Sequence, residues 1–127
     1  MQGDLKAARK VLDGLPPAVA KSSDVAAAAA AVELAEEGAG AGDVAKLRRT
    51  LETSPDDHAT RFALAVALYG KQHTEAAIEE LLRIIRADRH WNDEAARKQL
   101  VKIFDALGPS HPLTLASRRR LSAILFS

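Results

Sequence analysis

The spacing of apolar residues is the feature that most constrains how this chain of 127 residues can fold. Within short segments, apolar side chains recur every three to four residues, which is the pattern of a helix that buries one face. No stretch alternates apolar and polar residues for long enough to indicate a strand. The pattern predicts seven helices, over residues 4–12, 24–37, 43–53, 57–69, 74–87, 92–107 and 112–126. We therefore expect an all-α fold.

Glycine and proline separate the predicted helices. Pro16 and Pro17 follow the first helix, three glycines within residues 38–42 follow the second, and Gly108 precedes the last. Such short breaks are typical of antiparallel helical hairpins that stack on one another. Residues 62–69 are apolar at every position. We expect their helix to be buried on several sides, at the centre of the fold.

A repeat of about 34 residues runs through the middle of the sequence, and this is the period of the tetratricopeptide repeat. Leu64 and Ala65 occupy the large–small pair of its first helix, and Ala77 occupies the small position at which its second helix crosses the first. The corresponding places one period earlier hold Ala30, Ala31 and Leu34. One period later, Gln99 stands where a small residue is expected. Repeats at the end of a stack are often atypical in this way.

These features predict a tetratricopeptide-repeat-like α-α superhelix of about seven antiparallel helices, folded as a single domain over residues 1–127. In that arrangement Ala65 and Ala77 should face each other where the fourth and fifth helices cross. Residues 3–8 are similar to the second helix of such a repeat, and no first helix precedes them. We therefore expect the chain to be a piece of a longer protein.

Five segments of the second half carry a more specific resemblance. They cover residues 61–65, 79–89, 91–100, 104–108 and 118–126. They resemble the C-terminal region of the bacterial thioredoxin-like co-chaperones of the YbbN/CnoX type, closely over residues 55–127 and loosely over residues 3–54. The resemblance implies an upstream thioredoxin-like domain that these residues do not include. It also implies that the region holds unfolded client proteins and hands them to a chaperonin.

Composition excludes several classes of function. The chain has no cysteine, so thiol chemistry and cysteine-bound metals are impossible within it. Its 18 basic and 17 acidic residues give a net charge of +1, which provides no general attraction to nucleic acid or to an anionic membrane. The longest nearly apolar run, residues 25–34, is too short to cross a bilayer. The absence of cysteine also fits a cytoplasmic location.

No group of residues indicates catalysis, a cofactor or a bound metal. The histidines are far apart in the sequence, and turn or helix-start positions account for them. They are His58, His73, His90 and His111. The acidic pairs at residues 56–57 and 93–94 stand at helix starts, where the helix dipole favours negative charge. Gly38, Gly40 and Gly42 are not followed by the Lys-Ser or Lys-Thr of a phosphate-binding loop, and no strand precedes them. We therefore expect a binding protein without enzymatic activity.

Two further features have structural explanations. Trp91 precedes Asn92, the expected cap of the sixth helix, and should pack against Ala96 one turn into that helix. Residues 118–120 are three arginines, which fan over about 200° on a helix and cannot all hold one ligand. Their expected role is to form a solvated face with stems that cover apolar surface.

The last predicted helix carries the candidate binding surface. Leu121, Ile124 and Leu125 share one face and form the expected core stripe. A second strip, whose apolar members lie about 120–140° from Leu121, consists of Leu115, Arg119, Ser122 and Phe126. An aromatic and an arginine on an exposed strip are typical anchors of protein interfaces. Alternatively, Phe126 frays with the end of the helix or folds back onto the sixth helix.

The sequence therefore predicts a scaffold that binds proteins, either unfolded clients or a chaperonin, and that binds neither nucleic acid nor membrane. The alternative is a structural or oligomerising domain that only positions its neighbour. The predicted helix over residues 4–12 would expose Leu5, Ala8 and Leu12, because its own partner helix is missing. An exposed apolar strip of this kind would allow two copies to pair as a homodimer.

Overall fold

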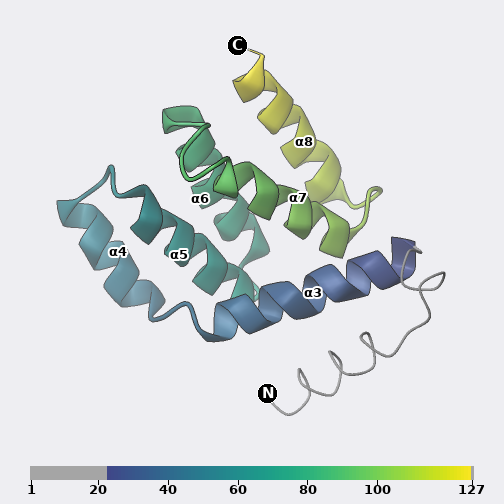
Figure 1. The fold of residues 1–127 in the computed structure, drawn as a ribbon, viewed down its shortest axis with the longest axis horizontal. Helices are drawn as coiled ribbons and strands as arrows, with labels where there is room; N and C mark the ends of the chain where they lie inside the picture. Colours follow the sequence, from purple (N-terminus) through teal and green to yellow (C-terminus); the bar gives the residue numbers. More distant parts are fainter. Residues whose placement is uncertain (1–22, 127) are drawn as a thin grey trace.

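The computed structural model describes residues 23–126, which form six α-helices and no strand. They are α3 (Ser23–Ala39), α4 (Val44–Thr53), α5 (His58–Gly70), α6 (Thr74–Ala87), α7 (Ala95–Leu107) and α8 (Pro112–Leu125), as Figure 1 shows. The predicted all-α fold class is confirmed. The six helices expected within this part of the chain are all present. The helix expected over residues 4–12 lies outside the described residues.

Side-chain caps begin two helices where the sequence places them. The Asp43 carboxylate accepts a 2.9 Å hydrogen bond from the Ala45 amide at the start of α4. At the start of α5, the Asp57 carboxylate accepts hydrogen bonds from the Thr60 hydroxyl at 2.7 Å and the Thr60 amide at 3.1 Å. These bonds hold the pKa of Asp57 below its ordinary value. Both aspartates therefore satisfy amide groups that the first helical turn leaves without partners.

The start of α7 differs from the prediction. The helix begins at Ala95, and Asn92 does not cap it. Asn92, Asp93 and Glu94 instead adopt positive φ angles of 49°, 57° and 61°, so the chain makes a left-handed turn before the helix. Asparagine and aspartate tolerate this conformation better than most residues, which is why they can stand here without serving as caps.

Two glycines set the closest helix crossing in the described structure. Gly38 lies within α3 and Gly70 ends α5, although the sequence suggests that Gly38 follows its helix. A Cβ atom on Gly38 would lie 2.6 Å from the Gly70 Cα, and a Cβ on Gly70 would lie 2.9 Å from the Gly38 Cα. The two backbones therefore touch directly, and only glycine leaves room for both.

The helix α3 packs across the other helices and makes little contact with its neighbour in sequence, α4. Its contacts fall on α5 and on α7, and Figure 1 shows it lying beneath both. The helices α5 and α6 form a hairpin and share the most extensive contact of any helix pair in the described part of the chain. Both α7 and α8 pack against this hairpin through α6. The first expected hairpin, α3 with α4, is therefore replaced by a long helix that covers two later ones.

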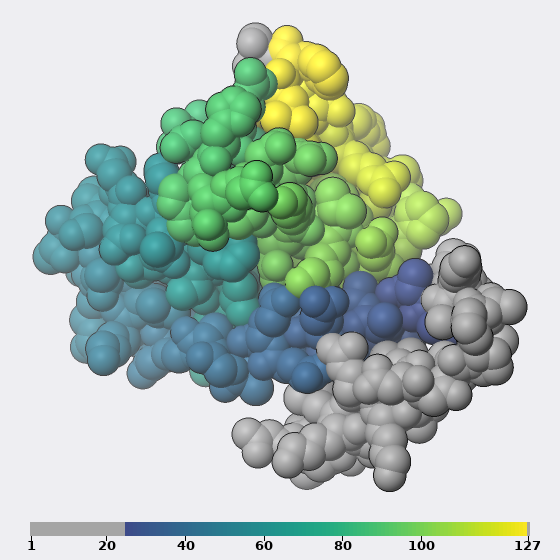
Figure 2. All heavy atoms as spheres, viewed as in Figure 1, coloured from purple at the N-terminus to yellow at the C-terminus, as the bar shows by residue number. Residues whose placement is uncertain are grey.

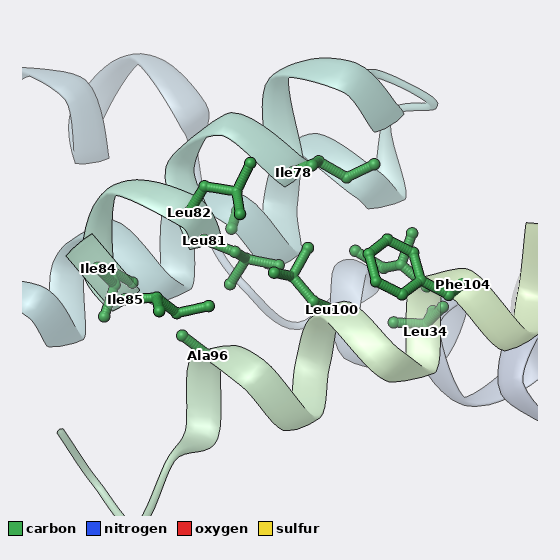
Figure 3. Packing of buried hydrophobic residues seen from close by; sticks show 11 residues of the cluster. Leu34, Ile78, Leu81, Leu82, Ile84, Ile85, Ala96, Leu100 and Phe104 are labelled. Carbon is green, nitrogen blue, oxygen red and sulfur yellow. The ribbon is translucent and has the colours of Figure 1, made fainter. Parts of the chain in front are cut away.

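The main core lies between α6 and α7. Figure 3 shows Leu81 of α6 and Leu100 of α7 pointing toward each other, with Leu34 of α3 beside Phe104 of α7. All four side chains are at most 2% exposed. A smaller cluster on the other side of α5 joins Leu64, Leu68 and Ala77 to the apolar face of α4. The helix α5 contacts α3, α4 and α6, so its expected central position is confirmed.

The repeat positions agree with the structure in part. Ala65 and Ala77 are both fully buried, as a close crossing requires, but they belong to different clusters. Their direct contact stays a prediction. Ala31 holds the same repeat position as Ala65, but Ala31 is exposed whereas Ala65 is buried. Gln99 is buried, and its amide donates a 2.8 Å hydrogen bond to Glu37 of α3. A polar residue is accepted at this position because α3 supplies its partner.

Replacing Gly38 with alanine should destabilise the fold by about 1–3 kcal/mol, because the new methyl group would overlap the Gly70 backbone. At an unconstrained helix position, replacing glycine with alanine stabilises the fold by about 1 kcal/mol. A loss of stability would therefore indicate the contact between the two backbones. Urea unfolding followed by circular dichroism measures it. The control is Gly40→Ala, whose Cβ would meet nothing closer than 4.0 Å. Equal midpoints for the two variants would contradict the backbone contact.

Candidate protein-binding surface

The outer face of α8 carries all four residues of the predicted strip. Leu115 is 47% exposed and Phe126 is 87% exposed, and Arg119 and Ser122 lie exposed between them. Phe126 is the first residue after the helix, and its amide still donates to the Ser122 carbonyl. The structure therefore places the strip on one continuous exposed face and does not fold Phe126 back onto α7. Whether this face binds a partner stays a prediction.

The inner face of α8 depends on small residues that the sequence pattern did not single out. Thr114 and Ser117 are its most buried side chains, at 0% and 4% exposure. Leu121, Ile124 and Leu125 pack against the main core but remain partly exposed. Small side chains thus occupy this face at the first turns of α8, and larger apolar side chains occupy it further on. Periodicity finds the large apolar residues of such a face but gives no weight to its small polar ones.

The three consecutive arginines contact three different groups. The Arg118 guanidinium lies 5.6 Å from the centre of the Phe104 ring, in a cation–π contact. Arg119 donates to the Leu115 carbonyl one turn earlier, at 3.4 Å. Arg120 makes two hydrogen bonds to Glu79 of α6. The expectation that they do not hold one ligand is consistent with this arrangement.

The ion pair between Arg120 and Glu79 joins α8 to α6. Hydrogen bonding from Arg120 is the main cause that holds the pKa of Glu79 below its ordinary value, and burial opposes it. A lowered carboxyl pKa contributes stability above the ordinary pKa, and this contribution is lost as the pH falls through the lowered one. Both side chains are nearly half exposed, so the pair adds little to stability at neutral pH.

The inner faces of α5 and α7 do not form an open groove, because α3 lies against both. Lys102 of α7 donates hydrogen bonds to Glu37 at 2.7 Å and Glu33 at 3.2 Å. Burial opposes the charged form of Lys102, but these bonds outweigh it and raise its pKa. A hollow of about 490 Å³ remains beside α3, with an apolar floor that includes Phe62 and Val66. The exposed face of α8 is therefore the more accessible surface.

Trp91 fixes the loop before α7 to the start of α5. Its ring lies 5.7 Å from the Phe62 ring and 6.0 Å from the His58 ring, the latter edge to face. Trp91 also packs against the main core cluster, to which Ala96 belongs, and its direct contact with Ala96 stays a prediction. His111 caps α8, since its Nδ1 accepts a 3.1 Å hydrogen bond from the Leu113 amide. A helix-start position thus accounts for this histidine, as the sequence suggests.

Among residues 23–126, no group of three or more histidine, aspartate or glutamate side chains is placed to hold a metal ion. None of the helices α3 to α8 is both long and apolar enough to span a bilayer.

Comparison with known proteins gives one match. A family model described as "Tetratricopeptide repeat" matches residues 37–126, from the last turn of α3 to the end of α8. No curated protein matches the chain, and no solved structure matches it. Most of α3 lies outside the matched residues, which agrees with its unusual packing across α5 and α7.

Phe126→Ala should leave the thermal melting temperature nearly unchanged, because the ring is 87% exposed. Leu121→Ala should lower the stability by about 1–2 kcal/mol, less than the about 2–5 kcal/mol typical of a fully buried leucine. The measurement is a pair of thermal melts followed by circular dichroism. A loss for Phe126→Ala as large as that for Leu121→Ala would show that Phe126 belongs to the core.

Proposed function

We propose that this chain, which belongs to the tetratricopeptide repeat family, is a protein-binding scaffold whose partner contacts the outer face of α8. Tetratricopeptide repeats generally mediate protein–protein interactions, and the repeats bury their own core while leaving extended surfaces free. The observation that carries the proposal is the exposed strip of Leu115, Arg119, Ser122 and Phe126. It combines a nearly fully exposed aromatic ring with an arginine and a leucine.

The energetics of this strip favour binding over a solvated role. Burying a phenylalanine side chain removes a large apolar area from water and contributes about 1.5–3 kcal/mol. Aromatic and arginine side chains dominate the affinity of many interfaces. The helix α8 holds Leu115 and Arg119 on a rigid backbone, so a partner would not have to order them on binding.

The partners that we propose are unfolded client proteins and a chaperonin. The support is the resemblance of residues 55–127 to the C-terminal region of bacterial thioredoxin-like co-chaperones, which includes α8 itself. On this proposal the chain works in the bacterial cytoplasm as the non-catalytic part of a longer protein. Its role is to hold a client or dock on the chaperonin, and it carries out no reaction of its own.

The alternative function is a structural or oligomerising domain. Such a domain would only position its neighbour or would pair with a second copy. The pairing would use residues 4–12, which lie outside the described residues. Analytical ultracentrifugation tests the oligomerising form, which requires a dimer that the Leu5→Glu/Leu12→Glu variant dissociates. A monomeric wild type at high concentration would exclude that form.

The proposed function predicts that the double variant Leu115→Ala/Phe126→Ala loses affinity for its partner. The full 127-residue chain is immobilised and exposed to a bacterial chaperonin, and separately to reduced, unfolded α-lactalbumin. Removing both apolar anchors should weaken binding to at least one partner by about tenfold or more, because two such anchors are together worth over 1.4 kcal/mol.

Val101→Ala provides the matched control. Val101 is 40% exposed on α7 and lies outside the strip, so its loss should leave affinity and melting temperature unchanged. If the Leu115→Ala/Phe126→Ala variant binds both partners as tightly as the wild type does, the outer face of α8 is not the binding surface. If neither partner binds the wild type, the co-chaperone assignment fails.

A further inference from the structure

We infer that the partner segment bound at the C-terminal half of α8 is an acidic, amphipathic peptide, with its carboxylates in a cleft between α6 and α8. This inference rests on the proposed protein-binding function and adds the chemistry of the partner. Two observations carry it: the cleft and its arginines, and the continuity of the cleft with the exposed face that ends in Phe126.

The cleft lies where α6 and α8 end side by side. Figure 2 shows the last turn of α8, in yellow, beside the green segment that follows α6. The cleft has a volume of about 710 Å³, within the range of about 300–1,000 Å³ typical of binding pockets. Its walls are the segment from Ile85 to His90 and three residues of α8, Arg120, Ala123 and Ile124.

The charges in and around the cleft are mostly positive. Arg86, Arg89 and Arg120 line it, against the single carboxylate of Asp88. The helix α8 has no acidic residue and two further arginines, neither of which lines the cleft: Arg118 lies over the Phe104 ring of α7, and Arg119 is exposed.

Most of these guanidinium groups have no carboxylate partner among the described residues. Arg120 pairs with Glu79. Arg89 donates instead to the Leu125 carbonyl, at 3.0 Å, and Arg86 makes no hydrogen bond or ion pair within residues 23–126. The Asp88 carboxylate accepts a hydrogen bond from the His90 amide and shapes the loop.

The five arginines at residues 86, 89 and 118–120 carry more positive charge than the nearby negative groups neutralise. The C-termini of α6 and α8 each carry the equivalent of about half a negative charge, which Arg86 and Arg89 offset in part. Together with the carboxylates of Glu79 and Asp88, these poles account for about three of the five positive charges on residues 86, 89 and 118–120. The excess of about two positive charges that remains is that of Arg118 and Arg119, which lie on α8 outside the cleft, and it favours an anionic partner along this helix.

The cleft adjoins the exposed strip of α8 through Ala123. This residue lines the cleft, and Phe126 stands three positions further on, on the same side of the helix. A peptide that packs an apolar residue against Phe126 can therefore place neighbouring carboxylates beside Arg86 and Arg89. Guanidinium groups match the geometry of carboxylates well, which adds specificity to the charge attraction.

An acidic peptide fits this surface better than a nucleic acid does. The apolar anchors need apolar side chains on the partner, whereas a nucleic acid would require an extended basic track along its backbone. Here the three arginines that line the cleft form no such track, and the chain as a whole has a net charge of only +1.

The test uses three peptides of equal length with the same leucine and phenylalanine positions. Their remaining positions are all glutamate, all glutamine or all lysine. Fluorescence anisotropy with the 127-residue chain should rank the glutamate peptide about tenfold tighter than the glutamine peptide, with the lysine peptide weakest. Raising the salt from about 50 mM to about 300 mM should remove most of the glutamate advantage, since exposed charges are then screened.

The variant Arg86→Ala/Arg89→Ala should weaken the glutamate peptide about five- to tenfold and leave the glutamine peptide unchanged. The control Lys46→Ala/Arg49→Ala makes the same charge change on the exposed side of α4, which packs mainly against α5, and should have no effect. Arg89→Ala also removes a hydrogen bond to α8. If the double variant has a lower melting temperature than the wild type, the single variant Arg86→Glu replaces it in the test.

Each other outcome overturns a specific statement. Equal affinities for the glutamate and glutamine peptides, both weakened by Phe126→Ala, would overturn the acidic partner and leave the proposed function standing. If no peptide binds while the chaperonin still binds, the acidic partner is also overturned and the proposed function still stands. A twelve-nucleotide oligothymidylate that binds as tightly as the glutamate peptide, and that Arg86→Ala/Arg89→Ala also weakens, would show that the surface reads phosphate.

Discussion

The direct contact of two backbones at Gly38 and Gly70 determines how α3 lies on the rest of the molecule. Because neither residue has a side chain, α3 and α5 approach until their main chains touch. From that crossing α3 extends over α7, where Leu34 meets Phe104 in the main core and Glu37 meets the buried Gln99. The apolar contact and the hydrogen bond both depend on the angle that the glycine crossing allows.

The position of α3 also decides which surface remains free. In a regular stack of helical hairpins, the first helices of successive repeats line a common groove. Here those helices are α5 and α7, and α3 packs against both, with Lys102 held by Glu33 and Glu37 at its edge. Of the large apolar side chains that are exposed among the described residues, Leu115 and Phe126 lie on α8 or directly after it. The arginines that surround them give this helix its chemical character.

The helix α8 shows how one sequence can serve packing and binding on different faces. Thr114 and Ser117 let the helix approach the core closely, and Arg120 ties it to Glu79. With these contacts on the inner side, Leu115 and Phe126 are not needed for packing and remain available. A surface built on a helix that is already fixed loses less entropy on binding than one built on a mobile segment.

The sequence by itself determined the helices within residues 23–126, the central position of α5 and the exposed strip of α8, because these follow from local periodicity. It did not determine that Gly38 belongs to a helix, that Asn92 lies in a left-handed turn, or that Arg86, Arg89 and Arg120 line one cleft. Those facts depend on distances between segments far apart in the chain. Periodicity reports which face of a helix is apolar, but only tertiary packing decides what that face meets and which charges are brought together.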